Sequence, residues 1–234
     1  MGAAYALKLE NSHNIVVCYF GEGAASEGDF HAALNVAATR DCPVVFICRN
    51  NGYAISTPTL EQYKGDGIAS RGIGYGIETI RVDGNDIMAV YAATQAARKI
   101  ASESQKPVLI EAMSYRVSHH STSDDSFAYR AKVDVEEWKR RDNPITRFRK
   151  WLEVKKWWST NEETAFRTRV RKDVLKAFAK AEKEKKPPLK DIFTDVFKEA
   201  TPELLEQQEE LRRVLDAYPD EYELGDFEGG RNGA

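Results

Sequence analysis

The feature that most constrains this chain is a pair of short apolar runs, each followed at once by glycine and polar residues. Residues 15–20 (Ile-Val-Val-Cys-Tyr-Phe) precede Gly-Glu-Gly-Ala-Ala-Ser-Glu-Gly-Asp at 21–29, and residues 43–48 (Pro-Val-Val-Phe-Ile-Cys) precede Arg-Asn-Asn-Gly-Tyr at 49–53. Continuous runs of β-branched and aromatic residues are typical of strands buried on both faces. The runs therefore predict two strands of a parallel sheet.

The residues between the two runs predict a crossover helix. Small apolar residues recur with helical spacing over 27–40, and Ser26 followed by Asp29 is a plausible helix start. A strand, helix and strand in this order form a right-handed parallel unit. Ligands of open α/β sheets bind at the carboxyl ends of the strands, which is where both polar stretches lie.

The polar stretches carry residue types suited to a metal-bound phosphate. The Glu22 carboxylate and the Asn51 carboxamide offer the oxygen ligands that Mg²⁺ prefers. Glycines at 21, 23 and 28 let backbone N–H groups approach a phosphate closely. Either stretch alone also fits an ordinary turn. Together they predict that a magnesium ion and a phosphate bind at one edge of the sheet.

The next part of the chain continues the alternation of strands and helices. Strands are predicted at 78–84 and 107–113, with a helix over 86–102 between them, which indicates an α/β fold with a mainly parallel sheet flanked by helices. The glycine-rich segment 63–76 fits either a binding surface or a plain connection.

A polar loop, residues 115–125, follows the last predicted strand and should lie beside the same sheet edge. Its two adjacent histidines, His119 and His120, fit either exposed polar residues or groups that contact a phosphate and move a proton. The Ser/Thr cluster could accept a phosphate, for which Arg116 and Arg130 are candidate cationic partners.

We expect three parts along the chain: an α/β domain at 1–132, a helical C-terminal extension at 133–220 for packing and subunit contact, and a disordered tail at 221–234. The extension contains all four tryptophans and amphipathic helices over 162–185 and 204–215. A net charge of −3 argues against nucleic acid as a partner, and no apolar run approaches membrane-spanning length. Cys18, Cys42 and Cys48 lie in or beside predicted strands, which predicts reduced, buried thiols.

A family resemblance follows from these motifs. The thiamine diphosphate signature resembles a pattern in this chain: Gly-Glu-Gly, then the 26 residues from 24 to 49, then Asn-Asn. Together with the stretches 49–57, 63–69, 81–86 and 118–125, it makes the chain resemble the α subunits of branched-chain 2-oxoacid dehydrogenases. The pyruvate dehydrogenase α subunits, which typically have Asp within the first motif, are the second candidate.

The resemblance implies a role for each matched residue. Mg²⁺ would be bound by the Glu22 and Asn51 side chains and the Tyr53 carbonyl, and thiamine diphosphate would be contacted by Gly23, Ala24, Arg49 and His120. His120 would contact the terminal phosphate and serve proton transfer, which makes it the expected catalytic residue. Ser121 matches an inhibitory phosphorylation site, whereas a second site of the family falls at Ala131.

The resemblance also implies partners and a location. The expected activity is oxidative decarboxylation of branched-chain 2-oxo acids, such as 3-methyl-2-oxobutanoate, with acyl transfer to lipoyl groups. The expected partners are a β subunit in a complex of two α and two β chains, a lipoyl acyltransferase core, and a regulatory kinase and phosphatase. The location would be the mitochondrial matrix, or the cytoplasm in a bacterium.

One departure from the family limits this expectation. The family's α subunits have a segment before the position of Met1 that carries further diphosphate contacts, a K⁺ loop and any presequence. We therefore expect this chain to hold the Mg²⁺ half of the site and to lack the rest. Two other functions stay open: a truncated, non-catalytic product that only binds partners, and a generic Mg²⁺-dependent phosphate-binding protein.

Overall fold

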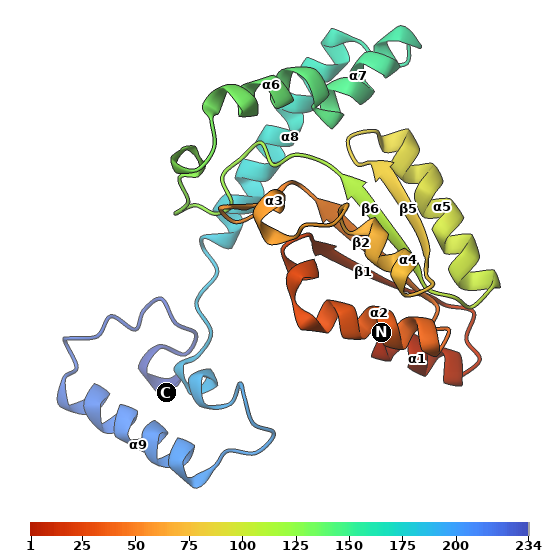
Figure 1. Cartoon of the computed structure of the whole chain (residues 1–234). Helices are drawn as coiled ribbons and strands as arrows, with labels where there is room; N and C mark the ends of the chain where they lie inside the picture. The colour runs from red at the N-terminus through yellow and green to blue at the C-terminus, as the bar shows by residue number, and fades with distance from the viewer. Residues whose placement is uncertain (234) are drawn as a thin grey trace. The chain divides into compact units, whose positions relative to one another are not determined.

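Four parallel strands form the sheet on which the molecule is built (Figure 1). In this computed structural model, which describes residues 1–233, they are β1 (Val16–Gly21), β2 (Val44–Asn50), β5 (Glu78–Asp83) and β6 (Val108–Met113), in the spatial order β1-β2-β6-β5. The register pairs Gly21 with Arg49, and pairs Met113 with both Asn50 and Asp83. All four strands therefore end at one edge, as the sequence predicted.

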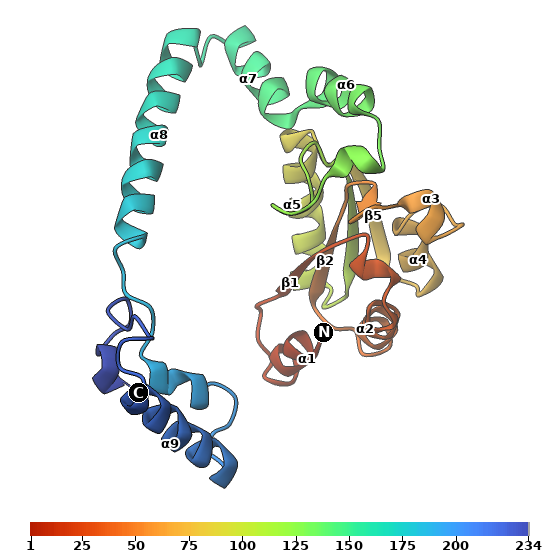
Figure 2. The same ribbon diagram turned by 90° about the vertical axis from the view of Figure 1, so that its left-hand side faces the viewer.

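The central strands have apolar side chains on both faces because successive residues point in opposite directions. On one face Val44, Phe46 and Cys48 pack with Leu34 of α2 (Gly28–Thr39). On the other face Val45, Val108 and Ile110 pack against α5 (Ile87–Glu103). Figure 2 shows α5 on the opposite side of the sheet from α2 and α4 (Ala69–Gly74). A core on each face fixes the strands that carry the polar edge.

Strand β1 departs from the prediction of burial on both faces. Within residues 1–233 it pairs with β2 alone, so it is an edge strand. Val17 is 43% exposed, Tyr19 is 75% exposed, and the Cys18 thiol is also exposed. The prediction of buried thiols is therefore wrong for Cys18 and confirmed for Cys42 and Cys48.

The crossover after β1 contains two helical pieces instead of one. Ala24–Ser26 forms a 3₁₀ turn, η1, and α2 begins only at Gly28. The predicted start at Ser26 is wrong, because the Ser26 hydroxyl donates to Gln62 Oε1 at 3.4 Å instead of capping α2. The remaining helices of this region are α1 (Gly2–Leu9) and the single-turn α3 (Thr59–Gln62), which follows a small hairpin of β3 (Tyr53–Ala54) and β4 (Thr57–Pro58).

The chain divides into two compact units, and the division falls after Trp158 instead of residue 132. The first unit therefore includes η2 (Ser126–Ala128), α6 (Lys132–Asp142) and α7 (Pro144–Val154). The second contains α8 (Thr160–Ala181), η3 (Leu189–Phe193), α9 (Pro202–Ala217) and η4 (Gly230–Gly233). Among residues 1–233 no helix has the length and apolar character needed to cross a membrane.

Residues 221–233 make hydrogen bonds to other residues of the second unit, and the disorder expected for 221–234 stays a prediction. The Lys186 N–H donates to the Asp226 carbonyl and the Glu228 N–H donates to the Lys186 carbonyl, both at 2.8 Å. The Arg231 guanidinium donates to the carbonyls of Leu215 and, at 2.8 Å, of Pro219. These contacts join residues 226–231 to the segment after α8 and to the end of α9.

Candidate functional site

The carboxyl edge of the sheet brings Glu22 and Asn51 into contact. The Asn51 N–H donates to Glu22 Oε2 at 3.0 Å, and the Glu22 side chain is 1% exposed. The other oxygen, Oε1, is buried and has no hydrogen-bond partner among the described residues. A buried carboxylate oxygen without a donor is costly, so this atom is suited to accept a cation or a proton donor from a ligand.

Side-chain hydrogen bonds fix the turn that carries Asn51. The Asn51 Oδ1 atom accepts from the Tyr53 N–H and the Asn50 Oδ1 atom accepts from the Gly52 N–H, both at 3.2 Å. Gly52 has φ of +88°, a conformation that favours glycine. The sequence Asn-Asn-Gly therefore specifies a tight turn at this edge.

The backbone carbonyl and the ring of Tyr53 have different surroundings. Its partner in the hairpin is Pro58, which has no N–H, so that residue cannot donate to the Tyr53 carbonyl. The ring packs against the rings of Tyr115 and Tyr129, with centroids at 6.2 and 6.0 Å. The arrangement fits the expectation that Tyr53 acts through its carbonyl.

Gly23 and Ala24 lie directly after Glu22, and Gly23 has no room for a side chain. A Cβ atom at Gly23 would lie 2.8 Å from the Ala54 Cβ, so glycine is required where the two turns approach. Ala24 starts the 3₁₀ turn, and Arg49 is the exposed β2 residue opposite Gly21. The predicted cofactor-binding residues other than His120 thus follow or end the two strands, at one edge.

The polar loop also begins at this edge. The Ser114 N–H donates to the Asn50 carbonyl at 2.8 Å, and the Arg116 N–H donates to the Asn51 carbonyl at 3.3 Å. The position predicted for the start of this loop is therefore confirmed.

His119 and His120 have different surroundings within the loop. His119 Nδ1 accepts from the Ser126 N–H at 2.9 Å. The N–H of His120 donates to Asp124 at 2.8 Å, and with the Tyr129 hydroxyl it holds the pKa of Asp124 below its usual value. No hydrogen bond within residues 1–233 joins the His120 side chain to Glu22 or Asn51, so its contact with a cofactor stays a prediction.

Two buried arginines hold the loop in place. Arg116 donates to the Ile55 carbonyl and the Tyr129 hydroxyl, both at 2.6 Å. Arg130 donates to the carbonyls of Arg116 and, at 2.8 Å, of Ser118. Their observed role is structural, and their role as partners of a phosphate stays a prediction. Ser121 itself is exposed.

Sequence reasoning missed the Glu111 carboxylate, which lies inside β6 and is 0% exposed. It accepts hydrogen bonds from the Ile68 and Ala69 N–H groups, from Asn50 Nδ2 and from Arg81 Nε, at 2.8–3.0 Å. Burial alone would raise the pKa of Glu111, but these four donors hold it below its ordinary value. The sequence held one indication of this site, which is that Glu111 is a charged residue within an apolar run.

Few side chains at this edge could act as metal ligands, so side chains alone would not complete a metal site. Within residues 1–233, no cluster of three or more His, Cys, Asp and Glu side chains could hold a metal ion. The Glu22 carboxylate, the Asn51 carboxamide and the Tyr53 carbonyl provide three oxygen ligands. Mg²⁺ commonly completes such a partial set with water and phosphate oxygens, so the residues fit a Mg²⁺–diphosphate pair.

Comparisons with known proteins identify the family of the chain. The family model described as "Dehydrogenase E1 component" matches residues 1–190. Over 228 residues, or 97% of this chain, the 2-oxoisovalerate dehydrogenase subunit alpha proteins of Mus musculus and Homo sapiens are 56% and 55% identical, and that of Dictyostelium discoideum is 57% identical. The alignments cover 51–52% of those proteins, so the chain spans about half of their length. The chain belongs to the dehydrogenase E1 component family.

Proposed function

We propose that this chain provides the metal and diphosphate anchor of a branched-chain 2-oxoacid dehydrogenase α subunit. The reaction would be oxidative decarboxylation of branched-chain 2-oxo acids, such as 3-methyl-2-oxobutanoate, with acyl transfer to a lipoyl group. The observation that carries the proposal is the buried Glu22 Oε1 atom beside the Asn51 turn, which accepts no hydrogen bond from residues 1–233. The names of the relatives, 2-oxoisovalerate dehydrogenase subunit alpha, favour this substrate class over pyruvate.

Each residue of the anchor has a defined task. Glu22, Asn51 and the Tyr53 carbonyl would hold Mg²⁺, and Gly23 and Ala24 would let the backbone approach the diphosphate. Arg49 would add positive charge at the same edge. Thiamine diphosphate, on which the family depends, supplies the electron sink for decarboxylation when bound. This chain's contribution is to bind and orient.

His120 and Ser121 would act from the loop. His120 would contact the terminal phosphate and move a proton during acyl transfer, because one ring nitrogen of a neutral imidazole donates and the other accepts. A phosphate on the exposed Ser121 adds about −1.5 to −2 charges. That charge would lie close in sequence to Asp124, whose carboxylate holds the loop through His120 N and Tyr129. Phosphorylation would therefore loosen the loop and inhibit the enzyme.

The proposed assembly contains a β subunit, two copies of each chain, a lipoyl acyltransferase core, and a kinase and phosphatase. The word "subunit" in the relatives' names supports a multi-subunit complex. Those names also say "mitochondrial", which supports the mitochondrial matrix as the location.

Calorimetric titration of thiamine diphosphate, with and without Mg²⁺, tests the anchor in this chain assembled with its β subunit. Glu22→Gln is the variant and Glu27→Gln, at an exposed neighbour, is the control. If the carbonyl oxygen of the introduced glutamine keeps the hydrogen bond from Asn51, its NH₂ group takes the place of Oε1, where it cannot bind a metal. We expect Mg²⁺-dependent affinity to fall by at least about tenfold in Glu22→Gln only, since an ionic contact of this kind is worth about 1.5–3 kcal/mol.

Two results would contradict the proposal: equal affinity for Glu22→Gln and the wild type, or binding that does not require Mg²⁺. Decarboxylation rates of the same assembly on 3-methyl-2-oxobutanoate and on pyruvate decide the substrate class. Full activity of this assembly would show that the anchor needs none of the residues in the other half of the relatives.

A further inference from the structure

The glycine-rich segment Tyr63–Gly76 has no task in the proposed chemistry, yet it is attached to the site by buried hydrogen bonds. The N–H groups of Ile68 and Ala69 donate to the two oxygens of Glu111 at 2.9 and 2.8 Å. The Arg81 side chain adds a third donor at 3.0 Å. Glu111 therefore fastens the start of α4 to strand β6.

The same carboxylate reaches the Asn51 turn through one intermediate residue. Asn50 Nδ2 donates to Glu111 Oε1 at 2.9 Å, and Asn50 Oδ1 accepts from the Gly52 N–H at 3.2 Å. Asn50 is 3% exposed, so both bonds are shielded from water. The orientation of the Asn50 amide thus follows from Glu111, and the turn that carries Asn51 follows from Asn50.

The segment also contacts the turn after Glu22. The Arg71 guanidinium, from α4, donates to the Ala25 carbonyl and lies 4.9 Å from the centroid of the Tyr63 ring. The Tyr63 hydroxyl accepts from Asn50 Nδ2 at 3.2 Å. One short segment therefore contacts both turns of the candidate site.

The backbone of this segment approaches Glu111 too closely for a side chain to fit between them. Gly67 has φ of +68°, and a Cβ atom there would lie 2.8 Å from Glu111 Oε1 and 2.6 Å from the Arg81 guanidinium. The backbone is thus packed directly on the carboxylate. Close-packed interiors transmit strain, so a change at Glu111 should be felt by this segment.

We propose that Glu111 is a positioning residue, and that it sets the separation between the Glu22 carboxylate and the Asn51 carboxamide through Asn50 and the Tyr63–Gly76 segment. This inference rests on the proposed Mg²⁺ anchor. Mg²⁺ demands near-ideal octahedral geometry at about 2.0–2.1 Å, whereas Ca²⁺ tolerates irregular sites at about 2.3–2.6 Å. A misplaced Asn51 side chain therefore weakens Mg²⁺ binding more than Ca²⁺ binding.

The test compares Glu111→Gln with the control Glu78→Gln, which changes an exposed carboxylate on β5. Glutamine keeps the shape of Glu111, but its NH₂ group replaces one oxygen, and each oxygen accepts two of the four bonds, so two bonds are lost. Amide hydrogen exchange of the assembled protein reports on the turn without any ligand. Exchange at Asn51, Gly52 and Tyr53 is expected to rise at least about tenfold in Glu111→Gln, because buried hydrogen bonds are lost, with no change in Glu78→Gln.

The second readout is the ratio of Mg²⁺ to Ca²⁺ affinity, measured with thiamine diphosphate present. A general loss of stability would lower both affinities alike, whereas mispositioning lowers the ratio, by about tenfold on the same scale. Tyr63→Phe removes only the hydroxyl that contacts Asn50, so it should change the ratio in the same direction but by less. This variant replaces Glu111→Gln in the test if Glu111→Gln does not fold.

The two proposals fail in different ways. If the wild type binds neither metal nor thiamine diphosphate, the proposed anchor is overturned, and exchange at residues 51–53 alone decides the role of Glu111. If the wild type binds both but neither exchange nor the metal ratio changes in the folded variants, the positioning role is overturned and the anchor stands.

Discussion

Two buried carboxylates near the carboxyl edge of the sheet differ in how many of their oxygens have donors. Both Glu111 oxygens accept hydrogen bonds, from four donors in all, so this carboxylate is satisfied by the fold. Glu22 accepts one at Oε2 and none at Oε1 among the described residues. A satisfied carboxylate stabilises the protein, whereas a half-satisfied one has a position left for a ligand. This contrast indicates a structural role for Glu111 and a ligand-binding role for Glu22.

The pKa of Glu111 predicts how its contribution depends on pH. The folded protein holds this pKa below the ordinary value of 4.5, so ionised Glu111 stabilises the fold above that pH. The contribution is lost as the pH falls through 4.5 and then through the lower pKa of the folded state. Urea unfolding should therefore show Glu111→Gln less stable than the wild type by about 2–4 kcal/mol at pH 7, with the difference shrinking below pH 4.5.

The control for this titration is Glu78→Gln, whose exposed side chain should give a difference within about 0.5 kcal/mol at every pH. A difference between Glu111→Gln and the wild type that stays constant from pH 7 to pH 3 would show that the charge of Glu111 does not stabilise the fold.

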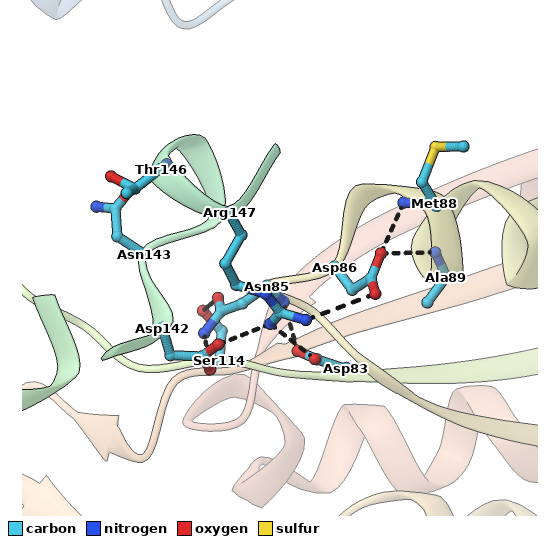
Figure 3. A network of polar contacts seen from close by, with 10 residues as sticks. All are labelled: Asp83, Asn85, Asp86, Met88, Ala89, Ser114, Asp142, Asn143, Thr146 and Arg147. Atoms are coloured by element: carbon cyan, nitrogen blue, oxygen red, sulfur yellow. Dashed lines mark hydrogen bonds and ion pairs between the residues drawn. The ribbon is translucent and has the colours of Figure 1, made fainter. Parts of the chain in front are cut away.

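At the scale of elements, an ionic network ties α6 and α7 to the sheet edge (Figure 3). Arg147 of α7 contacts Asp83 at 2.8 Å, Asp142 at 2.6 Å and Asp86 at 3.5 Å. Burial would raise the pKa of Asp83, but hydrogen bonds from Arg147 and the Asn85 N–H hold it below its usual value. The network joins the ends of β5 and α6 to the starts of α5 and α7.

Replacing Arg147 should release these helices. Arg147→Gln leaves three carboxylates near one another with no cation among them, and Arg147 is only partly exposed, so we expect a loss of about 1–2 kcal/mol. Hydrogen exchange in α6 and α7 should rise while β2 and β6 stay protected. Arg140→Gln, at an exposed position on α6, is the control. Unfolding of the sheet together with the helices would contradict a local role for the network.

Several elements were predictable because their signals are local. The strands β2, β5 and β6 and the helices α2, α5, α8 and α9 lie where the hydrophobic spacing placed them, with ends shifted by a few residues. The meeting of Glu22 and Asn51 was also predictable, since parallel strands end at one edge.

What the sequence did not predict depends on tertiary contacts. The apolar composition of β1 is typical of a central strand, but exposure depends on which neighbours are present. Ser26 has the chemistry of a helix cap, yet its hydroxyl contacts Gln62, which is 36 positions away. The buried network of Glu111 joins residues from several separate segments, and no local spacing encodes it.

At the scale of the whole molecule, the two compact units differ in how well their apolar side chains are buried. The first, Met1–Trp158, has a core on each face of its sheet. In the second, α8 buries none of its residues, and Phe166, Val174, Leu175 and Phe178 are exposed. Helices gain most of their stability from packing an apolar face, so α8 receives little stabilisation of this kind.

This division predicts that residues 1–158 fold as an isolated fragment. Circular dichroism and calorimetry should show one cooperative transition, with a midpoint within about 5 °C of that unit's transition in the full chain. Trypsin should cut the full chain first near Lys155 and Lys156, which lie just after α7. A fragment that lacks a cooperative transition would show that the units stabilise each other.

The exposed outer edge of β1 has a thermodynamic consequence. Its backbone groups and the Tyr19 side chain can pair with a further strand. A strand added in parallel would end near Gly21, so the loop after it would lie close to Glu22, whose Oε1 atom accepts no hydrogen bond from residues 1–233. Strand pairing and cofactor binding at this edge would then be linked equilibria. If the added strand increases the affinity for the cofactor by some factor, the bound cofactor increases the affinity for the strand by the same factor.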